Sequence, residues 1–248
     1  MESVVKLKEL GHDIVEVTMC DKEARNTFSE RLINGLVDIF EKINNNTAYK
    51  VVILAGYDNY FCCGGTKDEL IAIHKGEIVF NENPFFTAPL HCKIPVISAM
   101  QGHGIGGGFV FGLYADFCIL GKENIYTTNF MNYGFTPGMG GTYMVPFKLG
   151  SELGKEMLFS GLNYRGQELK ERGIPFKVVP KVNVLKEAFS FAKTLSQKPR
   201  ISLITLKEHM NGELKKKLPT VIDQELKMHE ITFHQPEVAE RIEKMFGR

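Results

Sequence analysis

Glycines at regular spacing follow an apolar run near the middle of the chain. The stretch AMQGHGIGGGFVFGLYAD contains Gly102, Gly104 and Gly107 in the pattern G-x-G-x-x-G, directly after the apolar residues 95–100. A strand followed by this pattern and a helix is typical of a dinucleotide site, with a pyrophosphate on the helix N-terminus and an acidic residue about twenty positions on for the ribose. Glu123 lies near that distance. The rest of the chain has to decide whether the glycines serve this chemistry or another.

A second glycine-rich turn occurs earlier, in YFCCGGTKDEL, where Gly64 and Gly65 again follow an apolar run and precede a helical pattern. Glycine permits tight turns from strand to helix, so either turn alone has an ordinary structural explanation. Two such turns after successive strands can bring their backbone N–H groups together. Converging N–H donors at helix N-termini bind a developing negative charge, so the pair favours an anion site.

The segments around these turns predict an α/β fold. The runs YKVVILAG, IPVISAM and DFCILG are typical of buried parallel strands, and residues 3–20 alternate as a β-hairpin does. Residues 29–43 have apolar positions at helical spacing behind Ser29, which we expect to be the N-cap. The repeated order of strand, glycine turn and helix indicates right-handed crossover connections.

The C-terminal part of the chain is predicted to be helical and charged. We expect residues 1–195 to form the core and residues 196–248 a helical lobe that covers the pocket or contacts another subunit. Within this lobe, Pro219 is expected to separate two helices.

Composition limits the classes of function. A chain of 248 residues with 44% hydrophobic content can bury one substantial core, and a formal charge of +1 gives no support for nucleic-acid binding. There is no secretory signal pattern or long apolar run, so we expect a cytoplasmic protein that does not span a membrane. The cysteines are odd in number, lack C-x-x-C spacing and are expected to be reduced and packed: Cys20, Cys62, Cys63, Cys92 and Cys118.

Three segments, taken in order, resemble the enoyl-CoA hydratase/isomerase superfamily, the crotonases. They are VVILAGYDNYFCCGGTKDEL, IPVISAMQGHGIGGGFVFGLYADFCIL and NFMNYGFTPGMGGTYMVPFKLG, and the resemblance covers essentially the whole chain. It implies a ββα spiral with C-terminal helices, assembled as a homotrimer or a dimer of trimers. It also implies that the N–H groups of Gly65 and Gly107 form an oxyanion hole for a thioester enolate, and not a pyrophosphate site.

Two departures from the family pattern bear on the reaction. The hydratases carry one catalytic glutamate two residues after the triple glycine and another four residues before the glycine of YGFTPG; here these positions hold Val110 and Phe130. Hydration needs a carboxylate to activate water and an acid to deliver a proton. Glu69, Glu77 and Glu82 lie nearby in sequence, but a surface helix ordinarily carries such residues.

Loss of carbon dioxide is a reaction that this site can perform without those glutamates. It leaves a dienolate that two N–H donors stabilise without any base to remove a proton. The segments AMQGHGIGGGFVFGLYADF, NFMNYGFTPGMGGT, YRGQELKERGIPFKVVP and MHEITFHQPEVAERI resemble the decarboxylating crotonases of polyketide β-branching. The resemblance implies a lyase that converts 3-methylglutaconyl thioester on an acyl carrier protein to 3-methylcrotonyl thioester, after an upstream crotonase-type dehydratase. It implies no metal and no cofactor beyond the phosphopantetheine or CoA that carries the substrate.

In that subfamily a C-terminal histidine and a lysine near the first glycine turn assist the reaction. His229 in KMHEITFH matches the histidine and is the expected proton donor. The lysine position is less determined: Val79 stands where another member has lysine, so Lys75 is the nearest candidate and Lys67 the second, with His74 ranked below both.

Other polar residues near the motifs have simpler expected roles. His103, in the glycine loop, is expected to make a structural hydrogen bond, and Asp116 to anchor the same loop. Cys62 and Cys63 are expected to be packed thiols without a nucleophilic role.

Three other functions stay open at this point. One is a hydratase or isomerase with relocated acids, and a second is a non-catalytic homologue that binds acyl thioesters. A dinucleotide enzyme is weaker, because it leaves the first glycine turn and YGFTPGMGGT unexplained. The sequence does not decide between carrier protein and CoA, between double-bond isomers, or between trimer and hexamer.

Overall fold

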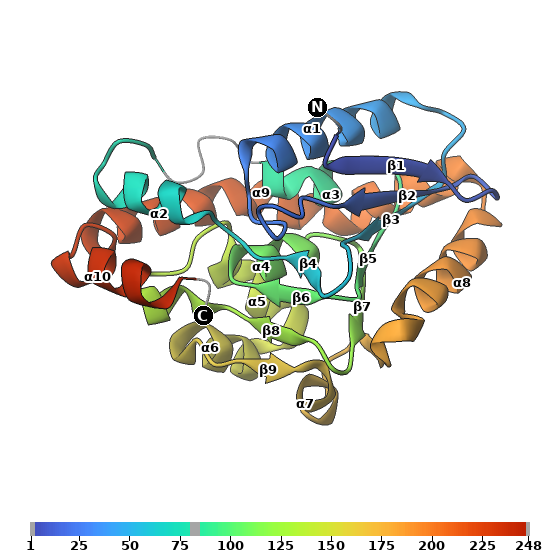
Figure 1. The fold of residues 1–248 in the computed structure, drawn as a ribbon. Helices are drawn as coiled ribbons and strands as arrows, with labels where there is room; N and C mark the ends of the chain where they lie inside the picture. Colours follow the sequence, from blue (N-terminus) through green and yellow to red (C-terminus); the bar gives the residue numbers. More distant parts are fainter. Residues whose placement is uncertain (1–2, 80–84, 247–248) are drawn as a thin grey trace.

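The computed structural model describes residues 3–79 and 85–246, which form two β-sheets with helices around them (Figure 1). The larger sheet has the strand order β1 (Val5–Glu9), β2 (Ile14–Met19), β3 (Val51–Ala55), β5 (Val96–Met100), β7 (Phe117–Gly121) and β10 (Lys177–Val179). The smaller sheet has the order β4 (Tyr60–Cys62), β6 (His103–Ile105), β8 (Ile125–Thr127) and β9 (Tyr164–Arg165). The predicted hairpin is confirmed, since β1 and β2 pair antiparallel, and β2, β3, β5, β7 and β10 are parallel neighbours.

Successive turns of the chain repeat one pattern, in which a strand of the larger sheet leads to a strand of the smaller sheet and then to a helix. β3 leads to β4 and α2, β5 leads to β6 and α4, and β7 leads to β8 and onward to α5. The α/β class and the ββα spiral implied by the resemblance are therefore confirmed. Periodicity alone did not predict β4, β6 and β8, because strands of three residues are too short to show alternation.

Helices cover both sheets, and none in the described ranges combines the length and apolarity needed to cross a membrane. Their bounds are α1 (Glu30–Asn45), α2 (Lys67–His74), α3 (Ala88–His91), α4 (Gly107–Leu113), α5 (Gly141–Leu149), α6 (Ser151–Ser160), α7 (Gly166–Glu171), α8 (Val184–Ser196), α9 (Arg200–Thr232) and α10 (Pro236–Met245). Short 3₁₀ segments cover Phe85–Thr87, Asn129–Tyr133 and Lys181–Asn183.

The first long helix begins as its sequence predicts. The hydroxyl of Ser29 accepts a hydrogen bond from the N–H of Leu32, which satisfies one of the free donors of the first turn. The buried side of α1 carries the expected apolar residues Leu32, Leu36, Ile39, Phe40 and Ile43.

The predicted break at Pro219 is wrong, because α9 is one helix of 33 residues with Pro219 inside it. A proline inside a helix removes one backbone hydrogen bond and crowds the preceding turn. On either side of Pro219, however, Leu218 and Val221 are buried against the core. This packing offsets the local cost, so α9 continues to the end of the molecule where α10 lies beside α2 (Figure 1).

Candidate active site

The first glycine turn connects β4 to α2 and needs glycine for close packing. Gly64 has a positive φ of 77°, and a side chain there would come within 2.9 Å of the carbonyl oxygen of Ile105. The same position is 3.2 Å from the backbone nitrogen of Gly107. The two glycine turns, far apart in sequence, therefore touch each other.

The second glycine turn connects β6 to α4. Gly106 has φ 54° and ψ −123°, a conformation open to glycine, and Gly107 is the first residue of the helix. A side chain on Gly108 would lie 2.1 Å from the carbonyl oxygen of Cys62, so the helix begins directly against the first turn. The convergence predicted from the two motifs is confirmed as a contact between backbones.

The N–H groups of Gly65 and Gly107 are both available to a ligand at this contact. Neither donates to an acceptor within residues 3–79 and 85–246. The first N–H groups of a helix have no intrahelical acceptor, which accounts for Gly107. Both residues line one cavity, so the pair could bind a carbonyl oxygen there.

The cavity between the turns has a volume of about 220 Å³. Its polar side chains are those of Cys63, Glu69, Asn129 and Tyr133. The rest of the wall is backbone and apolar side chains: Phe28, Ile33, Gly64, Gly65, Leu70, Ile78, Val79, Phe85, Phe86, Ile105, Gly106, Gly107, Phe130, Phe135, Met139 and Phe246. An acyl chain would therefore meet an apolar wall with few hydrogen-bonding groups.

Apolar side chains occupy both positions that carry glutamate in the hydratases. Phe130 is buried and lines the cavity, next to the ring of Phe135 at 6.3 Å between centroids. Val110 is fully buried in α4, where it packs toward Gly141. Neither position offers a group that activates water.

The sequence pattern predicts an ordinary surface residue of a helix at Glu69, but the structure places Glu69 in the cavity wall. Its carboxylate accepts a hydrogen bond from the N–H of Thr66 at 3.3 Å, and the Thr66 hydroxyl accepts one from the N–H of Glu69, which makes a capping box. Burial raises the pKa of Glu69, and the bond from Thr66 opposes the rise. In the sequence, only the motif T-x-x-E marks Glu69 as special, and this motif indicates a helix cap before it indicates a site residue. Of the other two glutamates, Glu77 is exposed and Glu82 lies outside the described residues.

His229 lies behind the cavity wall and not on it. Its Nε2 atom is 2.9 Å from the carbonyl oxygen of Thr136, and its ring meets the edges of Phe135 and Phe233. Its side chain is buried, and this burial lowers its pKa. Because Phe135 lines the cavity and His229 does not, the histidine contacts the wall from its outer side.

The two candidate lysines also lie off the cavity wall. The side chain of Lys75 is 59% exposed and its ammonium group is 3.8 Å from the carboxylate of Glu77, whereas Val79 does line the cavity. The nearest lysine in sequence is therefore not the residue that faces the cavity. Lys67 pairs with Glu243 at 2.5 Å.

His74 and His103 make structural contacts. The Nδ1 atom of His74 is 2.8 Å from the carbonyl oxygen of Phe233, which ties α2 to the end of α9. The predicted structural role of His103 is confirmed, because its Nδ1 atom accepts a hydrogen bond from the N–H of Ile125 at 2.9 Å.

A wider groove adjoins the cavity. The two share Cys63, Ile105, Asn129, Tyr133 and Phe246 in their linings. The groove also has Arg25, Lys67 and His103 in its lining, so basic and hydrogen-bonding groups lie at the open side of an apolar cavity. Of the two cysteines in the first turn, Cys62 is buried as expected, while Cys63 is partly exposed on both surfaces.

Polar residues of the long helix α9 pack against the rest of the fold. We call Lys207, Asn211, Glu225, His229 and their partners the α9 seam; Lys207, Glu225 and His229 are buried and Asn211 is partly buried. The Glu225 carboxylate accepts hydrogen bonds from the N–H groups of Gly140 at 2.6 Å and Thr142 at 2.8 Å and from the Thr142 hydroxyl at 2.5 Å. Burial raises the pKa of Glu225 to about 7, against these bonds, which lower it. Glu225 thus anchors the segment that carries Met139 into the cavity wall.

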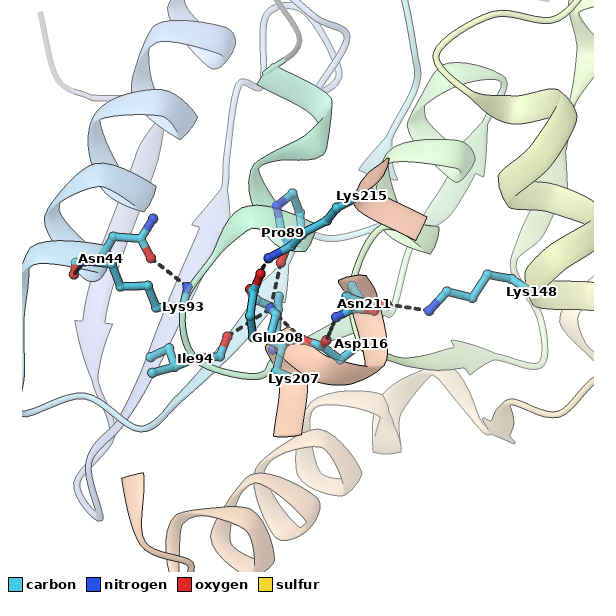
Figure 2. Close-up of polar contacts among 12 residues, drawn as sticks. Asn44, Pro89, Lys93, Ile94, Asp116, Lys148, Lys207, Glu208, Asn211 and Lys215 are labelled. Carbon is cyan, nitrogen blue, oxygen red and sulfur yellow. Dashed lines mark hydrogen bonds and ion pairs between the residues drawn. The ribbon is translucent and has the colours of Figure 1, made fainter. Parts of the chain in front are cut away.

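The second part of the α9 seam is drawn in Figure 2. The Lys207 ammonium group is 2.8 Å from the Asp116 carboxylate and donates to the carbonyl oxygens of Pro89 and Ile94. Asp116 also accepts hydrogen bonds from the Asn211 amide and the Val96 N–H. The expectation that Asp116 anchors the glycine loop is wrong. Its side chain points toward β5 and α9, so it holds the start of β5 and the helix α9 instead.

Comparisons with known proteins cover nearly the whole chain. The enoyl-CoA hydratase/isomerase family model matches residues 9–246. The chain is 52% identical over 245 residues to the bacillaene synthase decarboxylase PksI of Bacillus subtilis, covering 99% of this chain and 98% of the relative.

Solved structures give the same grouping. One from a study of a dehydratase/decarboxylase enzyme couple involved in polyketide β-branching has a TM-score of 0.98 and 52% identity, covering 99% of this chain and 100% of that chain. The ECH2 decarboxylase domain of CurF from Lyngbya majuscula has a TM-score of 0.95 and 46% identity, with coverage of 99% and 100%. The likeness to crotonases of the decarboxylating branch is confirmed. With its two converging glycine turns and a match over residues 9–246, the chain belongs to the enoyl-CoA hydratase/isomerase family.

Proposed function

We propose that the protein decarboxylates a 3-methylglutaconyl thioester carried by an acyl carrier protein and releases the 3-methylcrotonyl thioester. The observation that carries this proposal is a contrast within the site: Gly65 and Gly107 offer two N–H donors, while Val110 and Phe130 stand where hydration needs carboxylates. Support also comes from the relative at 52% identity, which is named a decarboxylase.

The reaction begins with loss of the terminal carboxylate. The bond between C4 and the carboxylate carbon breaks, carbon dioxide leaves, and the electron pair spreads through C2 and C3 to the thioester oxygen. The N–H groups of Gly65 and Gly107 stabilise that oxygen as its charge develops. No proton has to be removed from carbon, so the step is compatible with the two missing glutamates.

The apolar wall supports the same step. A carboxylate held away from water is costly unless it is paired, and its departure as carbon dioxide removes that cost. The charge left behind is delocalised and ends at the two N–H donors. The step needs no electron carrier, so we propose no cofactor beyond the phosphopantetheine arm, or CoA in its place, that holds the substrate.

The groove beside the cavity is the proposed path of the phosphopantetheine arm. Arg25 lines this groove, and its positive charge suits the phosphate of the arm and an acidic carrier protein. The substrate is an unsaturated acid of the kind that dehydration produces, and a similar solved structure belongs to a dehydratase/decarboxylase couple, so we propose that a crotonase-type dehydratase acts before this enzyme. We further propose a cytoplasmic homotrimer or dimer of trimers.

His229 and Lys75 have more limited proposed roles than the sequence suggested. His229 acts through Thr136 and Phe135 as a positioning residue that fixes one side of the cavity. Lys75, paired with Glu77 in solvent, contributes little to the bound acyl group.

Mass spectrometry of the purified protein with 3-methylglutaconyl carrier protein tests the proposal. We expect loss of carbon dioxide. Gain of water would favour a hydratase with relocated acids, and an unchanged but bound thioester would favour a non-catalytic acyl-thioester-binding homologue. We also expect no detectable hydration of crotonyl-CoA, and measurable hydration would contradict the assignment.

A further inference from the structure

The proposed reaction leaves one proton unassigned. After carbon dioxide departs, the dienolate must be protonated at C4 to give the 3-methylcrotonyl product, whereas protonation at C2 gives a different double-bond isomer. The donor must reach the cavity. Among the described residues, the ionisable side chains in its wall are Cys63, Glu69 and Tyr133.

Glu69 is well placed for this task. Its Oε2 atom lies 3.4 Å from the point where a Cβ atom on Gly65 would stand. The carboxyl group is therefore next to Gly65, one of the two residues that offer N–H donors. That oxygen accepts the Thr66 N–H, while the other oxygen, Oε1, makes no hydrogen bond within residues 3–79 and 85–246. Oε1 is therefore available to carry a proton toward a bound acyl chain.

The electrostatic surroundings favour the protonated form of Glu69. Burial raises the pKa of its carboxyl group. The nearby cations do not reverse this, because Lys75 pairs with Glu77 in solvent and Lys67 pairs with Glu243. A substrate carboxylate in the same cavity adds a like charge, which disfavours ionisation of Glu69 further.

The other two candidates are weaker acids. Burial raises the pKa of Cys63 to about 11 and raises that of Tyr133 above its usual range. A general acid is most effective when its pKa lies near the working pH, so a buried carboxyl group is better suited than a buried thiol or phenol.

We propose that Glu69 is the acid that protonates C4 of the dienolate, in place of the family glutamates that this chain lacks. The inference rests on the proposed function. The O–H bond of Glu69 breaks, its proton forms the new C–H bond at C4, and the electron pair of the dienolate returns to restore the thioester carbonyl. The Glu69 carboxylate then recovers a proton from water.

The variant Glu69→Gln tests this role while keeping the fold. Glutamine also serves at the third position of a capping box, so the start of α2 is preserved while the acidic proton is lost. Asp68→Asn is the matched control, because Asp68 is an exposed carboxylate in the same helix turn. The readout is the rate of 3-methylcrotonyl formation across a pH series.

We expect Glu69→Gln to slow that rate by about 10² to 10⁴-fold, while Asp68→Asn stays within about twofold. The wild-type rate should fall as pH rises through the pKa of Glu69, since the acid form is required, and this limb should be absent in Glu69→Gln. A slow variant that keeps the limb, or a variant with the wild-type rate and product, would overturn the role of Glu69.

Two further outcomes separate this inference from the proposed function. A wild-type protein that releases no carbon dioxide would refute both. If Glu69→Gln did not fold, the wild-type profile would decide: a rate that does not fall as pH rises would overturn the role, and a fall would support it.

Discussion

The cavity between α2 and α4 and the α9 seam both bury polar groups, but they differ in how those groups are partnered. In the seam, Lys207 is only 4% exposed and contacts three oxygen atoms, and Glu225 receives three hydrogen bonds. In the cavity, Gly65 and Gly107 have N–H groups without acceptors in the described part of the chain. The partners of Lys207 and Glu225 stabilise the fold, whereas the unused N–H donors of the cavity remain for a ligand.

The largest effect is expected where the seam loses one member of an ion pair. Asp116→Ala leaves the ammonium group of Lys207 buried without its counter-charge, which we expect to lower the free energy of unfolding by about 3–5 kcal/mol. Urea unfolding measures the change. The double variant Asp116→Ala, Lys207→Met should recover part of the loss, and a loss below about 1 kcal/mol in the single variant would mean that the pair is not structural.

The next effect tests the cavity itself. Gly65→Pro removes one N–H donor, and loss of such a donor costs about 10² to 10³ in kcat. Gly65→Ala is the control, because it keeps the N–H and its side chain would meet its neighbours at 3.4 Å or more. Equal rates for the two variants in the carrier-protein assay would show that the Gly65 N–H does not stabilise the transition state.

Within the α9 seam, Glu225 is expected to make stability depend on pH. Its pKa rises from 4.5 to about 7 in the folded protein, so the folded state binds the proton more tightly than the unfolded state. Stability is therefore lost as pH rises through this window, by at most about 3 kcal/mol.

Glu225→Gln should remove that part of the pH dependence, because glutamine does not titrate. The difference in Tm between wild type and variant, followed from about pH 4.5 to 7, isolates this contribution from those of His229 and His103, whose pKa values are lowered by burial. A difference that does not change with pH would show that Glu225 stays ionised throughout.

The features that the sequence predicts correctly are those set by local patterns. Glycine turns and apolar runs are local patterns, so Gly65, Gly107 and the strands β3, β5 and β7 follow from them. The short strand β4 has no visible period, and the continuity of α9 through Pro219 depends on buried contacts with distant residues.

The direction in which side chains point at the site is harder to predict from sequence. Glu69 and Lys75 lie on the same short stretch, yet one faces the cavity and the other faces solvent. The helix α2 sets this difference through its packing, with Leu70 and Ile73 on its buried side. Sequence proximity to a motif does not give that orientation.

The smallest effect is expected at Lys75 and sharpens the boundary of the cavity. Lys75→Ala removes an exposed ion pair with Glu77, and such pairs contribute about 0–1 kcal/mol to stability. Because the ammonium group does not line the cavity, KM for the carrier-bound substrate should change by less than about twofold. Glu77→Gln, which breaks the same pair from the other side, should match it in both KM and Tm. A rise in KM for Lys75→Ala alone would mean that the lysine reaches the substrate carboxylate on binding, and that the acyl cavity extends to the end of α2.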